Sequence, residues 1–462
     1  MMAPMNNKKF RAAIIISALL ISAASTAFML QPNRLVSANS VFSQQITFSD
    51  SFSVSAAPSL LWNQTYGGTE WDSAQSVIQT SDGGYALAGS TRSLGAGWSD
   101  FWLIKVDSLG NTEWNKTYGG AGEDVAQAVI QTIDGGYALV GRTAASAWFV
   151  KTDSSGKIQW NRTYNENYGE TKSGCLNSLI QTRDGSYALV GYTDFVPSFG
   201  GSFWLIKTDA AGNMQWNKTY GGNGASSVIQ TSDGGYALAG YIGSSMPDYY
   251  LVKTDSEGNM QWGKNYGSQD KDIGFSVVQA DDGGYVEGGW MWSRSNGGGS
   301  NIALVKTDAN GNLQWNRTYG AGEGWSTAKT SDGGYVIAGS KLVKTDSAGN
   351  EQWEMSFEDA GSTSYHQAYS VIQTLNGGFA LAGVVANGTT SDAWLAKIES
   401  GSSSQSSQPS PSASTSPSPT STQNLTPSPT PSIPEFPTWT ALTLFMAASG
   451  FFIVFRRRVK VK

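Results

Sequence analysis

The sequence predicts an all-β protein, a seven-bladed β-propeller of four-stranded antiparallel blades. Three observations lead to this prediction. One phrase recurs seven times at a period of about 50 residues, which is typical of a solenoid or a propeller. Each copy contains short β-rich runs separated by glycine turns, and no stretch has an apolar repeat of helical period. The composition agrees, because 55 glycines accompany 12% aromatic residues.

Two landmarks define the repeat. The first is a tight turn of the type Asp-Gly-Gly-Tyr, which begins at Asp82, Asp134, Asp184, Asp233, Asp282, Asp332 and Asn376. The second is a tryptophan, which stands at Trp62, Trp114, Trp160, Trp216, Trp262, Trp315 and Trp353. Both landmarks occur seven times, which predicts seven structural units.

One copy shows how each unit is built. Four strands are expected at 75–80, 85–91, 101–107 and 112–119. Tight glycine turns join the first strand to the second and the third to the fourth. Four antiparallel strands per unit are typical of a propeller blade, whereas the coils of a β-solenoid would be shorter and parallel.

The phase of the repeat predicts how the ring closes. The array begins with a surplus fourth strand at 61–67, and the strand at 394–399 has no partner after it. We therefore expect the N-terminal strand to complete the last blade. This pairing removes two exposed sheet edges, which would otherwise promote aggregation.

The repeated side chains are interpreted as structural. Tryptophans placed identically in every copy favour packing between blades over a row of ligand-stacking rings. A glutamine that recurs at Gln79, Gln131, Gln181, Gln230, Gln279 and Gln373 is interpreted as a buried hydrogen-bond partner.

The loops that differ between copies are the predicted binding region. Connections from second to third strands and between blades should share one face, and the second-to-third loops span 92–100, 142–147, 193–202, 242–249, 290–301 and 386–393. The candidate ligand-binding residues on this face are Trp71, Trp98, Glu123, Trp290, Trp292 and Trp325. Aromatic rings beside carboxylates suit sugars, and the alternative is that these rings pack onto the blades.

Asp72, Asp124 and Asp272 complete the candidate set, because each precedes the first strand of its copy. Carboxylates grouped at a channel mouth would suit calcium, and the alternative is capping of local turns. No other metal or cofactor is expected. His366 and Cys175 are the only residues of their types, so a zinc site of His and Cys ligands and an intrachain disulfide are both excluded.

The two ends predict export and membrane attachment. Residues 1–40 combine basic residues with an apolar run, as in a signal peptide or signal anchor, and 41–60 form a linker to the propeller at 61–399. Residues 400–433 are a Ser-, Pro- and Thr-rich stalk. In 434–462, an apolar stretch long enough to span about 27 Å as a helix precedes a basic tail, which should stay cytoplasmic.

The last segment resembles the PEF-CTERM sorting signal of archaeal surface proteins. The resemblance lies in Pro434, Glu435, Phe436 and Pro437, followed by the apolar stretch and the basic tail. It implies processing by an archaeosortase, which would transfer the chain to an anchor. The alternative is an ordinary tail anchor, and both place the protein on the extracellular face of the membrane.

Two further resemblances concern the repeats. The phrase at 204–216 resembles the tryptophan-docking phrase of quinoprotein-type propellers, over the third and fourth strands only. As a whole, the repeats are similar to those of secreted prokaryotic propellers, a family defined by fold more than by activity. On an exported chain, the predicted glycosylation sites are Asn63, Asn115, Asn161, Asn217, Asn316, Asn387 and Asn424, each in an N-x-T sequon.

These observations favour a cell-surface binding or adhesion module for glycan, envelope or protein ligands. The alternatives are a structural spacer in the surface layer and a propeller enzyme such as a glycosidase, lyase or quinoprotein dehydrogenase. The sequence shows no nucleophile motif and no histidine cluster, which disfavours an enzyme. A net charge of -6 disfavours nucleic acid as a partner.

Overall fold

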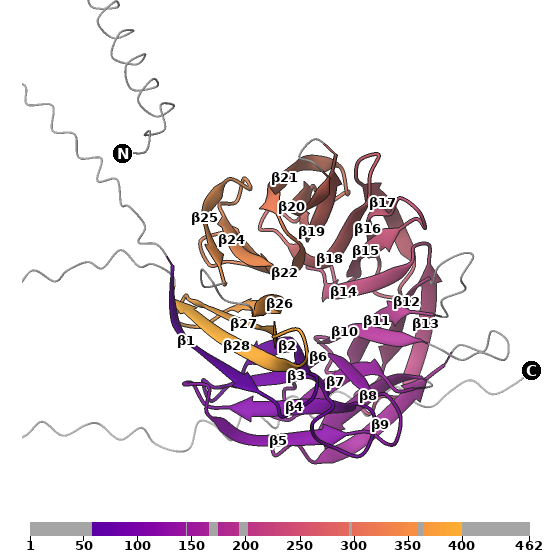
Figure 1. Ribbon diagram of the computed structural model, residues 1–462. Coiled ribbons are helices and arrows are strands. Elements are labelled where there is room, and N and C mark those ends of the chain that lie inside the picture. Colours follow the sequence, from indigo (N-terminus) through magenta and orange to yellow (C-terminus); the bar gives the residue numbers. More distant parts are fainter. Residues whose placement is uncertain are drawn as a thin grey trace, which may run out of the picture. The chain divides into compact units, whose positions relative to one another are not determined.

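The computed structural model describes residues 58–399, apart from residue 145 and the segments 166–173, 194–201, 295–297 and 358–363. The described residues form seven four-stranded antiparallel sheets arranged around a common axis (Figure 1). The predicted fold class is therefore confirmed. Segments 1–40, 400–433 and 434–462 and most of the linker lie outside the described residues. Within the described part, no helix is long and apolar enough to cross a membrane.

Blades 1 to 6 take their strands in chain order from the axis outward. Blade 1 comprises β2 (Asp72–Gln79), β3 (Tyr85–Thr91), β4 (Asp100–Val106) and β5 (Thr112–Tyr118). Blade 2 comprises β6 (Val125–Gln131), β7 (Tyr137–Arg142), β8 (Ala147–Thr152) and β9 (Ile158–Tyr164). Blade 3 comprises β10 (Cys175–Gln181), β11 (Tyr187–Tyr192), β12 (Phe203–Thr208) and β13 (Met214–Tyr220).

The same order continues around the ring. Blade 4 comprises β14 (Gly224–Gln230), β15 (Tyr236–Ile242), β16 (Asp248–Thr254) and β17 (Met260–Tyr266). Blade 5 comprises β18 (Asp272–Gln279), β19 (Tyr285–Ser293), β20 (Gly299–Thr307) and β21 (Leu313–Ala321). Blade 6 comprises β22 (Gly324–Lys329), β23 (Tyr335–Gly339), β24 (Lys341–Thr345) and β25 (Glu351–Ser356).

Blade 7 joins the two ends of the array. It comprises β26 (Tyr365–Gln373), β27 (Phe379–Ala386), β28 (Ser391–Glu399) and, at its outer edge, β1 (Ser59–Tyr66). Strand β1 pairs antiparallel with β28, so that Thr65 lies opposite Trp394. The predicted closure is confirmed, and β1 begins two residues earlier than the strand expected at 61–67.

The burial of the strands follows from the stacking of blades. The two middle strands of blade 1, β3 and β4, are buried almost throughout, whereas the outer strand β5 is largely exposed. Neighbouring blades cover both faces of the middle strands, which therefore carry near-continuous apolar runs such as Phe101–Ile104. The core consists of seven such clusters rather than one central mass.

The repeated tryptophans pack between blades, which confirms the structural interpretation. Trp62 of β1 meets Tyr85 of blade 1 edge-on, with ring centroids 6.0 Å apart. Its ring also approaches Gly110, where a Cβ would lie 2.8 Å away and where φ is +84°. Only glycine satisfies both the close approach and the left-handed backbone. Six further Trp–Tyr or Trp–Phe pairs repeat the contact around the ring.

The repeated glutamines connect one blade to the next. Gln131 Oε1 accepts a hydrogen bond of 2.8 Å from the Ser81 amide of the preceding blade. Gln79 Oε1 accepts one of 2.9 Å from Leu375, and this bond joins blade 7 to blade 1. The hydrogen-bonding role is confirmed, although these side chains are half-buried rather than buried. At the seam between blades 5 and 6, Lys329 stands in place of glutamine and pairs with Asp281.

Candidate functional site

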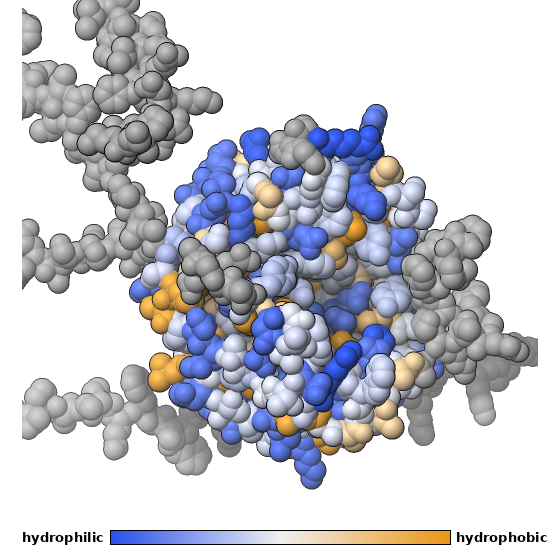
Figure 2. Space-filling view, viewed as in Figure 1, coloured by the Kyte–Doolittle hydropathy of each residue, from blue (hydrophilic) through white to orange (hydrophobic). Residues whose placement is uncertain are grey.

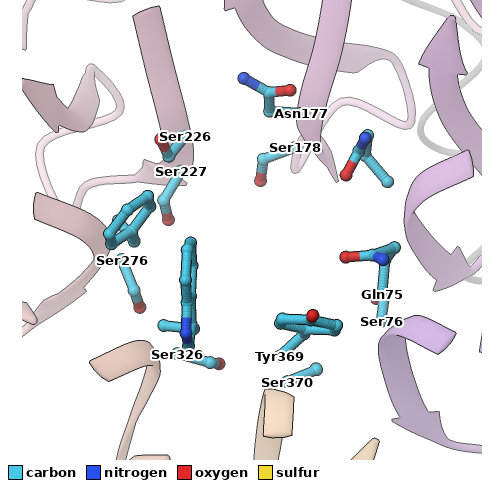
Figure 3. A pocket seen from close by; sticks show the side chains of 13 residues that line it. Gln75, Ser76, Asn177, Ser178, Ser226, Ser227, Ser276, Ser326, Tyr369 and Ser370 are labelled. Atoms are coloured by element: carbon cyan, nitrogen blue, oxygen red, sulfur yellow. The ribbon is translucent and has the colours of Figure 1, made fainter. Parts of the chain in front are cut away.

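The most distinctive hollow is a channel on the axis of the propeller, with a volume of about 500 Å³. The innermost strands of all seven blades form its wall. Figure 3 shows side chains from these strands projecting inward from every side, with Tyr369 and Asn177 on opposite walls. The channel is lined by Gln75, Ser76, Gln127, Asn177, Ser178, Ser226, Ser227, Phe275, Ser276, Trp325, Ser326, Tyr369 and Ser370.

One position of the inner strands forms a ring of serines that links the blades. Ser370 Oγ accepts a hydrogen bond of 3.2 Å from the Val77 amide, which again joins blade 7 to blade 1. The same contact joins Ser76 to Val129, Ser227 to Val277, Ser276 to Thr327 and Ser326 to Val371. Backbone amides facing the channel thereby gain partners. Alanine replaces serine only in blade 2, at Ala128.

The position just before these serines differs from blade to blade. Blades 1 to 4 carry Gln75, Gln127, Asn177 and Ser226 there, and blades 5 to 7 carry Phe275, Trp325 and Tyr369. We call these seven residues the variable column. It divides the channel into a polar wall and an aromatic wall.

The aromatic wall is continuous. The rings of Phe275 and Trp325 lie 4.4 Å apart between centroids and are inclined by 41°. Trp325 meets Tyr369 edge-on at 5.8 Å. All three side chains are only partly buried, so they present ring surface to the channel.

The polar wall retains unused hydrogen-bonding capacity. The Asn177 amide donates a bond of 2.9 Å to Ala225 O, and the Gln75 amide makes a long contact of 3.4 Å to Ser73. The Gln127 amide makes no hydrogen bond within the described part of the chain. No described residue lining the channel is charged at neutral pH, because Tyr369 is the one titratable group and burial raises its pKa.

A side pocket of about 240 Å³ extends the channel between blades 3 and 4. It shares Asn177 and Ser226 with the channel, so the two hollows meet there. Tyr192 and Tyr241 supply two more rings, and Asn223 supplies a further amide. The combination of rings and uncharged polar groups therefore continues beyond the axis.

The predicted loop-face aromatics are divided between distant blades. Trp71 precedes β2, and Trp98 lies in the loop after β3 with 76% of its surface exposed, beneath the Arg92 guanidinium at 5.9 Å. Trp290 and Trp292 belong instead to blade 5. Figure 2 shows hydrophobic residues scattered over the visible face, among many hydrophilic ones. The structure thus does not bring these tryptophans together.

Three of the predicted loop residues lie on strands instead. Trp325 is part of the inner strand β22 and lines the channel. Trp290 and Trp292 extend β19, where they pair with Ile302 and Ser300. The loop expected at 290–301 is therefore shorter, because the arms of this hairpin continue pairing as far as Ser293 and Gly299. Trp292 lines a separate hollow of about 240 Å³ with Met246, Asp270, Lys271 and Arg294.

The predicted aspartates are buried at the seams between blades, where they accept backbone hydrogen bonds. Asp72 Oδ2 accepts from the Gly68 amide at 2.8 Å, and Asp124 Oδ2 accepts from Gly120 at 2.9 Å. Asp272 Oδ1 accepts from Trp292 at 3.1 Å. These are the contacts of turn capping. Predicted Glu123 lies nearby and forms an ion pair of 3.2 Å with an arginine of β7.

Each of these aspartates also faces a second carboxylate that the sequence did not indicate. Asp72 Oδ2 and Asp392 Oδ1 both lie beside Gly67, and each would be 2.5 Å from a Cβ atom if another residue replaced this glycine. The pairs Asp124–Asp100 and Asp272–Asp248 meet in the same way at Gly119 and Gly267. Burial, together with the charge of Asp72, raises the pKa of Asp392. Within the described residues, no group of three or more His, Cys, Asp or Glu side chains is placed to hold a metal ion.

The predicted glycosylation sites of the blades are accessible. Exposed side chains occur at Asn63, Asn115, Asn161, Asn217, Asn316 and Asn387. The first five lie on outer strands, as expected. Three of them also accept a hydrogen bond from a buried indole; Asn217, for example, is 3.3 Å from Trp204 Nε1. Asn424 and the sorting residues 434–437 lie outside the described residues.

Most residues of the variable column were missed by the sequence analysis. Among them, only Trp325 was a candidate, and it was assigned to a loop. A signal was present, because the strand phrase Ser-Val-Ile-Gln is nearly constant while the residue before it changes from Gln75 to Phe275. A variable position inside an otherwise constant strand indicates that packing does not dictate the side chain.

Comparisons with known proteins identify the fold and no family. No protein-family model and no curated protein matches the sequence. Among solved structures, the WD40 propeller domain of Doa1 matches with a TM-score of 0.50 and 10% identity, over 74% of this chain and 97% of that one. The Pan2 WD40 domain of Neurospora crassa matches with a TM-score of 0.51 and 11% identity, over 74% and 96%. At this identity the likeness concerns the propeller fold alone.

Proposed function

We propose that the chain is a binding module displayed at the cell surface, and that it holds its ligand in the axial channel. The single observation that supports binding there is the variable column. The adjacent serines and the glutamines repeat because they link the blades, whereas this column divides the same ring into an aromatic and a polar wall. Variation of this kind on a rigid repeat scaffold is typical of recognition sites.

The proposed location rests on the sequence of the two ends. A basic and apolar N-terminal segment, a Ser/Pro/Thr-rich stalk and a C-terminal PEF motif with an apolar stretch all favour display outside the membrane. Exposed sequons on outer strands suit a glycosylated surface protein. Brief protease treatment of intact cells should release the propeller if it is displayed, and an intact chain after such treatment would contradict this.

The channel supports binding better than catalysis. General acid-base chemistry needs a titratable group near the substrate. Among the described lining residues only Tyr369 can titrate, and burial raises its pKa further from neutrality. A structural spacer, the other alternative, would need the links between blades but no asymmetric channel.

The test is to fill the channel without removing a contact. Ser226 is half-buried and lines the channel, and its side-chain hydroxyl makes no hydrogen bond within the described residues. Substituting Ser226→Trp should abolish binding of the full chain to isolated cell envelopes, measured by co-sedimentation. Trp98→Ala on the loop face is the matched control and should bind normally. Normal binding by the filled variant would contradict a channel site, and loss in the control would place binding on the loop face.

A further inference from the structure

We infer that the ligand of the axial channel is a neutral saccharide, with one sugar ring stacked on the aromatic wall and its hydroxyls bonded to amides of the polar wall. This inference rests on the proposed function, since it names the class of ligand for the same channel. It follows from the charge, the shape and the remaining hydrogen-bonding capacity of the lining residues.

The lack of charged side chains in the channel lining disfavours charged ligands. A carboxylate, phosphate or sulfate that entered the channel would lose part of its hydration, and no described lining residue offers a countercharge. The same reasoning excludes polyamines and metal ions, because no lining carboxylate is present. A neutral ligand avoids this penalty.

The aromatic wall requires a ligand with an apolar face. Phe275, Trp325 and Tyr369 come from three consecutive blades and form one arc of ring surface. Most buried aromatic groups of this chain are covered by a neighbouring blade, but these three face the channel. The C–H face of a sugar ring is flat and apolar, so it can cover an aromatic ring while its hydroxyls point sideways.

The polar wall completes the match. Gln127 and Asn177 occupy blades 2 and 3, across the channel from Trp325 of blade 6, and Gln75 of blade 1 lies between them and Tyr369 of blade 7. Figure 3 shows the Asn177 amide on the far side of the cavity from Ser326 and Tyr369, and the Gln75 amide at the side of the cavity, next to Tyr369. Each carboxamide both donates and accepts, as a hydroxyl does, and the Gln127 amide has its full capacity free.

A peptide is disfavoured by the state of the inner strands. One common way for a peptide to bind a sheet is to add a strand at its edge, which needs free backbone amides at that edge. Here serines already accept hydrogen bonds from the channel-facing amides of Val77, Val129, Val277, Thr327 and Val371. A peptide would have to break these links between blades.

The size also suits a short saccharide. The channel volume of about 500 Å³ falls within the usual range of small-ligand pockets, about 300–1,000 Å³. The side pocket with Tyr192 and Tyr241 adds room for a second sugar. A chain end, rather than a folded domain, is the form of ligand that can enter.

The experiment probes an array of neutral, uronic-acid-bearing and sulfated oligosaccharides, together with neutral peptides, with the full chain. The neutral trisaccharides that bind are then titrated by calorimetry. We expect binding in the neutral group only. Trp325→Ala should weaken it about tenfold, which corresponds to the loss of one aromatic contact. Trp325→Phe is the matched control, because it keeps a ring and should restore most of the affinity.

A second variant distinguishes loss of binding from loss of folding, in case the substitution at position 325 destabilises the protein. Gln127→Ala removes a side chain that bonds to nothing else in the described chain, so its melting temperature should stay unchanged while its affinity falls. If neutral peptides bind in a Trp325-dependent manner and saccharides do not, the saccharide inference is wrong and the channel function stands. If no probe binds in a manner sensitive to Trp325 or Gln127, the channel function itself is refuted.

Discussion

The buried amine of Lys397 lies 3.1 Å from Oδ1 of the exposed Asn376, and no carboxylate within the described residues forms an ion pair with it. The other six blades place an aspartate at the equivalent position; in blade 1, Lys105 Nζ lies 2.9 Å from Asp82. Burial lowers the pKa of Lys397 to about 8. At Lys105 burial acts in the same direction, but hydrogen bonds and the charges of Glu113 and Asp82 outweigh it and raise the pKa.

The first prediction is that Asn376→Asp stabilises the protein at neutral pH. Because the folded-state pKa of Lys397 is lowered, the unfolded chain binds this proton more tightly, so stability falls as pH drops from about 10 to about 8. Supplying a carboxylate should remove this fall. Melting temperatures of both proteins across this pH range test the expectation. The reciprocal control Asp82→Asn should destabilise blade 1. Parallel pH curves for wild type and Asn376→Asp would contradict the lowered pKa of Lys397 as the cause.

The second prediction is a loss of stability in acid between about pH 4 and pH 2. Burial alone would raise the pKa of Asp82, but hydrogen bonds from Thr80 and Lys105 outweigh it and lower the pKa to about 2. Asp184 and Asp233 also titrate at about 2, with the same balance of causes. Groups with a lowered pKa stabilise above the unfolded value of about 3.9 and lose this effect as pH falls through the folded value. Free energies of unfolding in urea should show this slope.

The matched control for acid sensitivity is the triple variant with asparagine at positions 82, 184 and 233. It should be less stable at pH 7 and show a shallower dependence below pH 4. An unchanged acid slope in this variant would mean that other carboxyl groups dominate.

The third prediction concerns Glu287, which is 1% exposed where blades 1 to 4 carry leucine. Neither carboxyl oxygen makes a hydrogen bond of good geometry within the described residues. Burial raises the pKa of Glu287 well above its ordinary value, and the nearby Gly240 amide opposes this only in part. Glu287→Leu should raise stability at pH 7 by about 1–2 kcal/mol, because a poorly satisfied buried polar group is removed.

The pH dependence separates this cause from better packing. With a raised folded-state pKa, the contribution of Glu287 is full below the unfolded value of about 4.3 and declines as pH rises. The stability gain of Glu287→Leu over wild type should therefore grow between pH 4 and pH 7, and Glu287→Gln should change relative to wild type by the same amount over this range, because both variants remove the titrating carboxyl group. A gain that is constant across this range would indicate packing alone.

The fourth prediction tests ring closure. Trp62 lies on β1, and Tyr66 of the same strand donates a hydrogen bond of 2.7 Å to Gly110 O of blade 1. Trp62→Ala should cost about 2–3 kcal/mol, since this tryptophan is half-buried and full burial would cost about 3–5. Trp160→Ala, an equivalent contact between blades 2 and 3, should cost a similar amount in urea unfolding. A negligible effect at position 62 beside a large one at 160 would show that closure contributes little.

Several features were predictable because the repeat itself contains them. The number of blades, the four strands of each blade and the closure by β1 follow from the spacing and phase of Trp62, Asp82 and their equivalents. The packing of the tryptophans and the bonding of the glutamines followed from their repetition. Local patterns such as these are sufficient because each blade contacts only its neighbours.

The site was not predictable in the same way. The sequence placed Trp325 in a loop between blades, whereas the structure places it on the inner strand β22, beside Phe275 and Tyr369. These two residues lie about 50 positions away on either side along the chain. The meeting of Asp72 with Asp392 likewise depends on the ring being closed.

Sequence alone thus determined the scaffold, since a period and its phase are one-dimensional properties. Only the tertiary structure decided which side chains share a cavity. The physical reason is that seven inner strands converge on one axis, so residues that are remote along the chain become neighbours across a single channel.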